Sequence, residues 1–176
     1  MVSVAAPILA VAAASGSGKT TLLTRLLPEL RAQGVRCAVI KHSHHDVEFD
    51  VPGKDTHRLR EAGAAQVLLA SPYRCFWVEE GDGVTEPPLQ DMLCRLDLAR
   101  INLVLVEGYR HERLPKIEIH RTRLGKPLLC THDPDVIAVA TDAPAGLGLD
   151  LPCLPLNDAR AVAAFVIHWM RGKLPD

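Results

Sequence analysis

The chain has 176 residues, of which 48% are hydrophobic and 23% charged, and its formal net charge at pH 7 is −1. This length and hydrophobic content fit one compact domain, so we expect a single domain over residues 1–176. Because both charge signs are interspersed and no apolar run approaches the roughly 18 residues of a membrane helix, neither nucleic acid nor a membrane is an expected partner. The five cysteines form no Cys-x-x-Cys pair, which indicates reduced core residues in a cytoplasmic protein.

The first predicted strand covers Ile8–Ala12 and leads into residues 13–20, whose sequence is AASGSGKT. An amphipathic helix follows from Lys19, and Pro28 is expected to kink or interrupt its last turn. A glycine-rich turn between a buried strand and a helix is typical of a P-loop, in which backbone N–H groups surround a phosphate. Ala13 stands in the place of the first glycine, which we treat as a tolerated variant.

The P-loop motif assigns a role to each of its polar residues. The Lys19 ammonium would contact the β and γ phosphates of a nucleoside triphosphate, and the Thr20 hydroxyl would coordinate Mg²⁺. We therefore expect the nucleotide to be bound by Ser15, Gly16, Ser17, Gly18, Lys19, Thr20 and Thr21.

A second buried strand is predicted over residues 35–41, followed by a long polar loop over residues 42–55. Long ordered loops in compact domains are usually functional, so we expect a switch-like segment here. Asp50 would be free to face the nucleotide, whereas Asp55 would cap a helix over residues 56–62.

The remainder of the chain alternates predicted strands and helices. Strands are expected at residues 66–71, 73–79, 101–106, 116–120 and 136–140, and helices after Pro88 and after Asn157-Asp158. This alternation predicts an α/β, three-layer P-loop NTPase fold in which a mostly parallel central sheet carries helices on both faces.

Mg²⁺ prefers oxygen ligands, and the sequence offers Thr20, Asp50 and Glu107 for it. Glu107 follows the strongest buried strand of the second half, where P-loop proteins usually carry an acid. Asp142 is a candidate acceptor for the N1 and N2 protons of guanine, but no Asn-Lys-x-Asp motif occurs, so GTP and ATP both stay open. No residue stands out for positioning the attacking water, so the catalytic residues are unknown and hydrolysis should be slow.

Four segments resemble the molybdopterin-guanine dinucleotide biosynthesis adapter proteins, the MobB family. They are residues 15–22 (SGSGKTTL), 39–42 (VIKH), 50–56 (DVPGKDT) with Arg58, and 104–109 (VLVEGY) followed by 115–118 (PKIE). The resemblance implies a P-loop GTPase-like fold, usually dimeric, that binds GTP with Mg²⁺ and hydrolyses it weakly. Its residue matches are Gly16, Gly18, Lys19 and Thr20 for phosphate and Mg²⁺, and Asp50 and Glu107 for the acidic positions.

The resemblance also implies an auxiliary function. Such adapters help the molybdenum cofactor guanylyltransferase attach GMP to molybdopterin, and they assist delivery of the cofactor to molybdoenzyme apoproteins. The expected partners are therefore these two classes of protein and a second copy of the chain. Ala13 and Ala14 depart from the residues that the family usually has there, which leaves the strength of nucleotide binding open.

Two other functions stay open at this point. A P-loop small-molecule kinase would need arginines to shield the phosphoryl group from water, and the candidates are Arg110, Arg113, Arg121 and Arg123. A nickel-insertion-type GTPase is suggested by His42, His44 and His45. These histidines lack a cysteine partner and helical spacing, which favours solvated side chains, or contacts to nucleotide or partner, over a metal site.

Overall fold

The computed structural model describes residues 6–173, and the chain divides into two compact units. The larger one, called the P-loop unit below, contains the residues up to His42 and those from Leu89 onward. The smaller one, called the insert unit, is Ser43–Pro88. Within the described residues, the helices are too short or too polar to span a bilayer.

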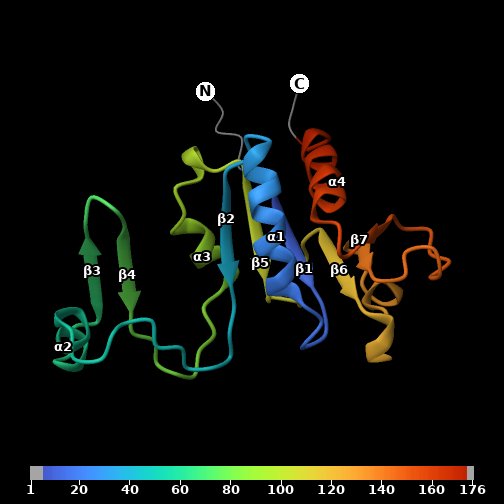
Figure 1. Ribbon diagram of the computed structural model, residues 1–176. Helices are drawn as coiled ribbons and strands as arrows, with labels where there is room; N and C mark the ends of the chain where they lie inside the picture. The colour runs from blue at the N-terminus through green and yellow to red at the C-terminus, as the bar shows by residue number, and fades with distance from the viewer. Residues whose placement is uncertain (1–5, 174–176) are drawn as a thin grey trace. The chain divides into compact units, whose positions relative to one another are not determined.

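The P-loop unit contains a six-stranded sheet in which all neighbouring strands are parallel, in the order β2-β5-β1-β6-β7-β8 (Figure 1). The strands are β1 Ile8–Ala12, β2 Cys37–Lys41, β5 Leu103–Glu107, β6 Lys116–His120, β7 Val136–Thr141 and β8 Cys153–Pro155. Because β1 lies between β5 and β6, the segment that follows β1 emerges near the middle of the carboxyl edge of the sheet. Ligands bind at this edge in open α/β folds.

Helices cover both faces of this sheet. They are α1 Lys19–Ala32, α3 Leu89–Cys94 and α4 Ala159–Arg171, and the 3₁₀ turns are Leu98–Arg100, Thr122–Leu124 and Leu129–Thr131. Helices α1 and α4 pack against each other on one face. Helix α3 packs on the other face through Leu89 and Leu93.

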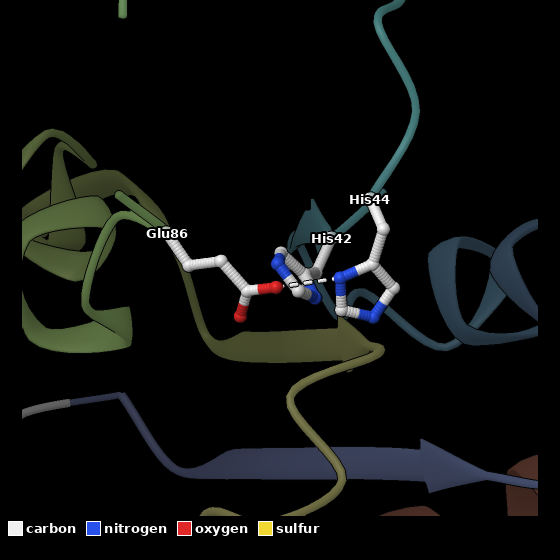
Figure 2. A group of neighbouring side chains, drawn as sticks. All are labelled: His42, His44 and Glu86. Carbon is white, nitrogen blue, oxygen red and sulfur yellow. Dashed lines mark hydrogen bonds and ion pairs between the residues drawn. The ribbon is translucent and has the colours of Figure 1, made fainter. Parts of the chain in front are cut away.

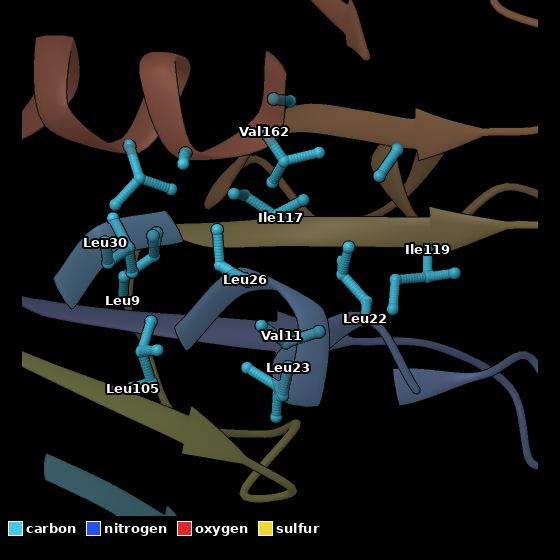
Figure 3. Packing of buried hydrophobic residues seen from close by; sticks show 14 of the residues in the cluster. Leu9, Val11, Leu22, Leu23, Leu26, Leu30, Leu105, Ile117, Ile119 and Val162 are labelled. Carbon is cyan, nitrogen blue, oxygen red and sulfur yellow. The ribbon is translucent and has the colours of Figure 1, made fainter. Parts of the chain in front are cut away.

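The strand residues divide between two cores, because successive side chains of a strand point to opposite faces. On one face, Leu9 and Val11 of β1 pack with Leu26 of α1 and Val162 of α4 (Figure 3). On the other face, Ala10 of β1 belongs to the smaller core that includes α3. The arrangement confirms the predicted α/β fold with a parallel central sheet between two helical layers.

The insert unit consists of α2 Asp55–Glu61 and an antiparallel pair of strands, β3 Gln66–Ala70 and β4 Cys75–Glu79. These strands were expected from their sequence pattern, but they form a sheet of their own. Arg60 of α2 connects the two ends of the unit. Its guanidinium donates to Glu48 at 2.9 and 3.1 Å and to Glu80 at 2.5 Å. The hydrogen bonds from Arg60 lower the pKa of Glu48 to about 2.

Several local expectations are wrong. The interruption expected at Pro28 does not occur, because helix α1 continues through this residue to Ala32; Pro28 is exposed, so water can satisfy the carbonyl that loses its N–H partner. Asp55 is the first residue of α2, where its charge complements the helix dipole, and the N-cap position belongs to Lys54. Strand β8 was not expected, because its three residues end in a proline and are too few to show a period.

The expectation that the cysteines are core residues is also wrong. Cys75 and Cys94 are exposed, and the other three are half-buried. All five are free thiols. The cap of α4 is confirmed, because the Asp158 carboxylate accepts a hydrogen bond from the Ala161 N–H at 3.0 Å.

Candidate functional site

The P-loop connects β1 to α1 and is shaped by its own backbone. Gly16 and Gly18 have φ values of 76° and 97°, a region that glycine enters without steric cost. The Ser17 hydroxyl donates to the Ala14 carbonyl at 2.8 Å, which closes the turn. Helix α1 begins at Lys19, so its N-terminal N–H groups and positive dipole end meet the loop, as an anion site requires.

Lys19 lies back over the loop that it follows. Its ammonium is 3.4 Å from the Ala13 carbonyl oxygen and 3.5 Å from the Ala14 carbonyl oxygen. Both distances are long for hydrogen bonds to an ammonium, so these contacts are weak. Phosphate oxygens, which are charged acceptors, would compete well for the same three donors.

The structure brings Thr20 and Glu107 together. The Thr20 hydroxyl donates toward the Glu107 carboxylate, with oxygen–oxygen distances of 3.2 and 3.3 Å. Parallel pairing of β1 with β5 explains this contact, because Glu107 lies opposite Val11 near the start of the P-loop. The Glu107 side chain is only 9% exposed, and the Lys41 ammonium lies 3.9 Å from it.

This pair fits Mg²⁺. A hydroxyl oxygen and a carboxylate are the hard donors that this ion prefers, and Mg²⁺ in nucleotide sites usually takes its other ligands from phosphates and water. Glu107 is nearly buried, so its charge would act with little screening. Thr20 and Glu107 would therefore hold the ion, and the ion would neutralise charge on the phosphates.

The third expected metal ligand, Asp50, belongs to the insert unit and is engaged there. Its Oδ1 accepts from the Thr56 hydroxyl and the Val51 N–H, both at 2.9 Å. Its Oδ2 is buried without a hydrogen bond and lies 3.8 Å from an Arg60 nitrogen. These contacts give Asp50 a role in ordering the insert unit.

Arg121 connects two parts of the predicted site, a role that its sequence position does not indicate. Its Nε donates to the Ser17 carbonyl of the P-loop at 2.9 Å, and its Nη1 lies 4.0 Å from Asp142 Oδ2. Asp142 Oδ1 accepts from the N–H and the hydroxyl of Thr122, at 3.0 and 3.1 Å. The Thr122 N–H is the main cause of a lowered pKa at Asp142, which therefore stays a carboxylate.

The segment after Glu107 is tightly folded against β2. Gly108 has a φ of 97°, and a Cβ added to it would lie 2.7 Å from the Cβ of His42, so only glycine fits. The His42 N–H donates to the Glu107 carbonyl at 2.8 Å, and the His42 ring lies 4.5 Å from the Tyr109 ring. This packing holds the Glu107 backbone in place.

Each loop histidine makes a contact within its own unit. His42 packs on Tyr109 in the P-loop unit. In the insert unit, His44 Nδ1 lies 2.5 Å from Glu86 Oε1, and both side chains are exposed (Figure 2). The His45 N–H donates to the Ser43 hydroxyl at 3.1 Å.

Comparison with known proteins identifies related chains along most of the length. The profile of the family "MobB: Molybdopterin guanine dinucleotide synthesis protein B" matches residues 8–142. The molybdopterin-guanine dinucleotide biosynthesis adapter protein of Escherichia coli K12 is 46% identical over 168 residues, which cover 95% of each chain. The protein of the same name from Haemophilus influenzae is 42% identical over 164 residues, covering 93% of this chain and 89% of the relative.

Solved structures agree with these matches. A crystal structure of a molybdopterin-guanine biosynthesis protein B superposes with a TM-score of 0.70 at 26% identity, over 92% of this chain and 99% of the other. A MobB homologue from Bacillus stearothermophilus gives a TM-score of 0.68 at 23% identity, over 94% of this chain and 98% of the other, and shows the same fold.

Proposed function

Because this chain belongs to the MobB family of molybdopterin guanine dinucleotide synthesis proteins, we propose that it is an adapter protein of molybdopterin-guanine dinucleotide biosynthesis that binds GTP and Mg²⁺ at its P-loop. The contact of the Thr20 hydroxyl with the Glu107 carboxylate, at 3.2 Å, carries the nucleotide part of this proposal. It supports the proposal because it brings a hydroxyl and a carboxylate, the donors that Mg²⁺ prefers, together at the start of α1, next to Lys19. The family assignment does not favour the kinase or the nickel-insertion GTPase.

Guanine is the proposed base, and Asp142 is the proposed acceptor for it. Thr122 occupies Oδ1 of this carboxylate, whereas Oδ2 keeps its acceptor positions on the side of Arg121. The hydrogen bonds from Thr122 lower the pKa of Asp142 further below neutral pH, so the group is a carboxylate and can accept from N–H donors. Arg121 would then fix the position of Asp142 relative to the P-loop, because its guanidinium lies near Asp142 and also donates to the Ser17 carbonyl.

Slow hydrolysis is part of the proposal. Fast P-loop GTPases place an arginine or a glutamine against the transferred phosphate. Here the arginine beside the P-loop donates to a backbone carbonyl and lies near Asp142. We therefore expect the bound nucleotide to act mainly as a switch. The proposed location of the protein is the cytoplasm.

The insert unit is the proposed contact surface for a second copy of the chain. None of its residues is buried, and large apolar side chains are exposed on it: Phe49 by 82%, Leu68 by 66%, Tyr73 by 90% and Val84 by 88%. An isolated two-stranded hairpin is marginally stable in water, so this unit gains most from a partner that covers it. The guanylyltransferase and molybdoenzyme apoproteins are the other proposed partners.

Titration calorimetry with GTP and ATP, with and without Mg²⁺, tests the nucleotide site. We expect 1:1 binding that prefers GTP and requires Mg²⁺ for full affinity. Lys19→Ala should abolish this binding while the protein stays folded, because the ammonium makes no strong contact in the fold. The matched control is Arg25→Ala, an exposed residue of α1. Unchanged GTP affinity in Lys19→Ala would refute the site, and an ATP preference would refute the guanine assignment.

Light scattering of the native chain tests the dimer. We expect a dimer that Leu68→Glu converts to a monomer, since a carboxylate buried in an apolar contact is unfavourable. Gln90→Glu adds the same charge at an exposed position of α3 and should leave the dimer intact. A monomeric native chain would overturn this part alone. Co-purification with the guanylyltransferase tests the adapter role.

A further inference from the structure

A pocket of about 440 Å³ lies on one flank of the P-loop. Ala13, Ala14 and Ser17 of the loop form one wall, and the connection from Arg121 to Asp133, between β6 and β7, supplies much of the other. Its volume is within the range of roughly 300–1,000 Å³ that small-molecule sites usually have. Neither Lys19 nor Thr20 is among the described residues that line the pocket. The pocket thus adjoins the proposed phosphate site and does not contain its central groups.

The charged side chains of the pocket favour an anion. Arg110, Arg121 and Lys126 line it, together with His111 and His120. Two acids line it as well, and the fold already uses both. The Asp133 carboxylate lies 2.9 Å from the ammonium of Lys116, and Glu118 accepts backbone hydrogen bonds.

Glu118 adds a specific recognition element. This residue is 2% exposed, and its two oxygens accept from the N–H groups of Leu129 and Cys130, at 2.7 and 2.9 Å. Each carboxylate oxygen has a second lone pair, one of which the Cys130 thiol shares. A ligand with two adjacent N–H donors would displace this weak donor and bond to both oxygens in parallel. The amino group and the adjacent ring N–H of a 2-amino-4-oxopyrimidine present two donors side by side. Leu124 and Pro127 supply apolar surface for a flat ring.

We propose that this pocket binds a second ligand beside the P-loop nucleotide, an anionic pterin. The pyrimidine edge of the pterin would face Glu118, and its acidic substituent would face Arg110 and Lys126. Guanine has the same pair of donors, so the pocket could bind either a pterin or the base of GTP. A competition experiment between the pterin and GTP distinguishes these two ligands. The choice of a pterin rests on the proposed function, whereas the location and charge of the pocket do not.

Equilibrium dialysis of the full chain tests the inference, with pterin-6-carboxylate as the probe and the uncharged 6-hydroxymethylpterin as its comparison. We expect the carboxylate to bind 1:1 in the presence of saturating GTP and Mg²⁺, and the uncharged pterin to bind about tenfold more weakly, as the loss of a charge-assisted contact predicts. The double variant Arg110→Gln/Lys126→Gln should lose this preference. Arg123→Gln is the matched control, since it is exposed on the same connection and does not line the pocket.

Three results would overturn the inference: no binding of the carboxylated pterin, displacement of the pterin by GTP, or equal affinity in the double variant and the native chain. GTP binding measured on the same samples separates this test from that of the proposed function. A protein that binds GTP and no pterin contradicts the inference alone, and one that binds the pterin and no GTP contradicts the nucleotide proposal alone.

Discussion

Replacing Glu107 by glutamine isolates the charge that we assign to Mg²⁺. Glutamine has nearly the same shape and can still form a hydrogen bond with the Thr20 hydroxyl, which lies 3.2 Å from the carboxylate. Lys41 loses a charged neighbour at 3.9 Å, but its own side chain is 58% exposed, so water replaces that contact at little cost. The substitution therefore removes the negative charge and keeps the fold.

The expected loss follows from the burial of the group. Hydrogen bonds and contacts to charged groups contribute about 1.5–3 kcal/mol, and the Glu107 residue is only 7% exposed. In the presence of Mg²⁺, Glu107→Gln should weaken GTP binding by roughly 10- to 100-fold, since about 1.4 kcal/mol corresponds to a factor of ten. In EDTA the variant should bind GTP no more weakly than the native chain, because a carboxylate without a metal ion only repels phosphate.

Titration calorimetry in Mg²⁺ and in EDTA measures both affinities, and a thermal melt checks that the variant is folded. Glu112→Gln is the matched control, because it removes an exposed carboxylate from the segment that follows β5. The reasoning is refuted if Glu107→Gln loses the same factor with and without Mg²⁺, since the carboxylate would then act only by shaping the loop.

Three further changes test the surroundings of the site. Gly108→Ala should lower the free energy of unfolding by about 1–3 kcal/mol in urea denaturation, because φ is 97° and the new methyl group would lie 2.7 Å from the Cβ of His42; an unchanged midpoint would contradict the close packing. Glu118→Gln should cost about 1–3 kcal/mol, since one of two buried backbone N–H groups loses its acceptor; native-like stability would mean that water replaces the lost bond. At pH 8 an alkylating reagent should modify exposed Cys75 much faster than Cys37, because burial raises the pKa of Cys37 to about 11 and the thiolate is the reactive form; mass spectrometry that finds equal rates would contradict the burial of Cys37.

Local patterns in the sequence were enough to predict most elements of the P-loop unit. The alternation of short apolar runs with amphipathic segments predicted β1, α1, β5, β6 and β7, because side-chain period and burial follow from a few neighbouring residues. The P-loop itself is contiguous, so the residues that we propose for phosphate binding could be named from residues 13–20 alone. The Asp158 cap is local for the same reason.

Long-range contacts needed the tertiary structure. Thr20 and Glu107 are 87 positions apart, and they meet only because β5 pairs with β1 in the observed register. Arg121 and Ser17 are 104 positions apart, so the sequence could offer Arg121 only as one of several arginines near the site. The hydrogen bond that the Asp50 carboxylate accepts from Thr56 within the insert unit also came only from the structure, and its role as a metal ligand stays a prediction.

The same distinction explains the sheets. The sequence predicted β3 and β4 as strands, but their backbone groups pair with each other in a separate antiparallel sheet. Strand propensity and side-chain period are properties of neighbouring residues, and the sequence by itself determined them. The choice of partner strand, and therefore which side chains from distant positions share a site, depends on how whole elements pack to bury apolar surface and to satisfy their backbone hydrogen bonds.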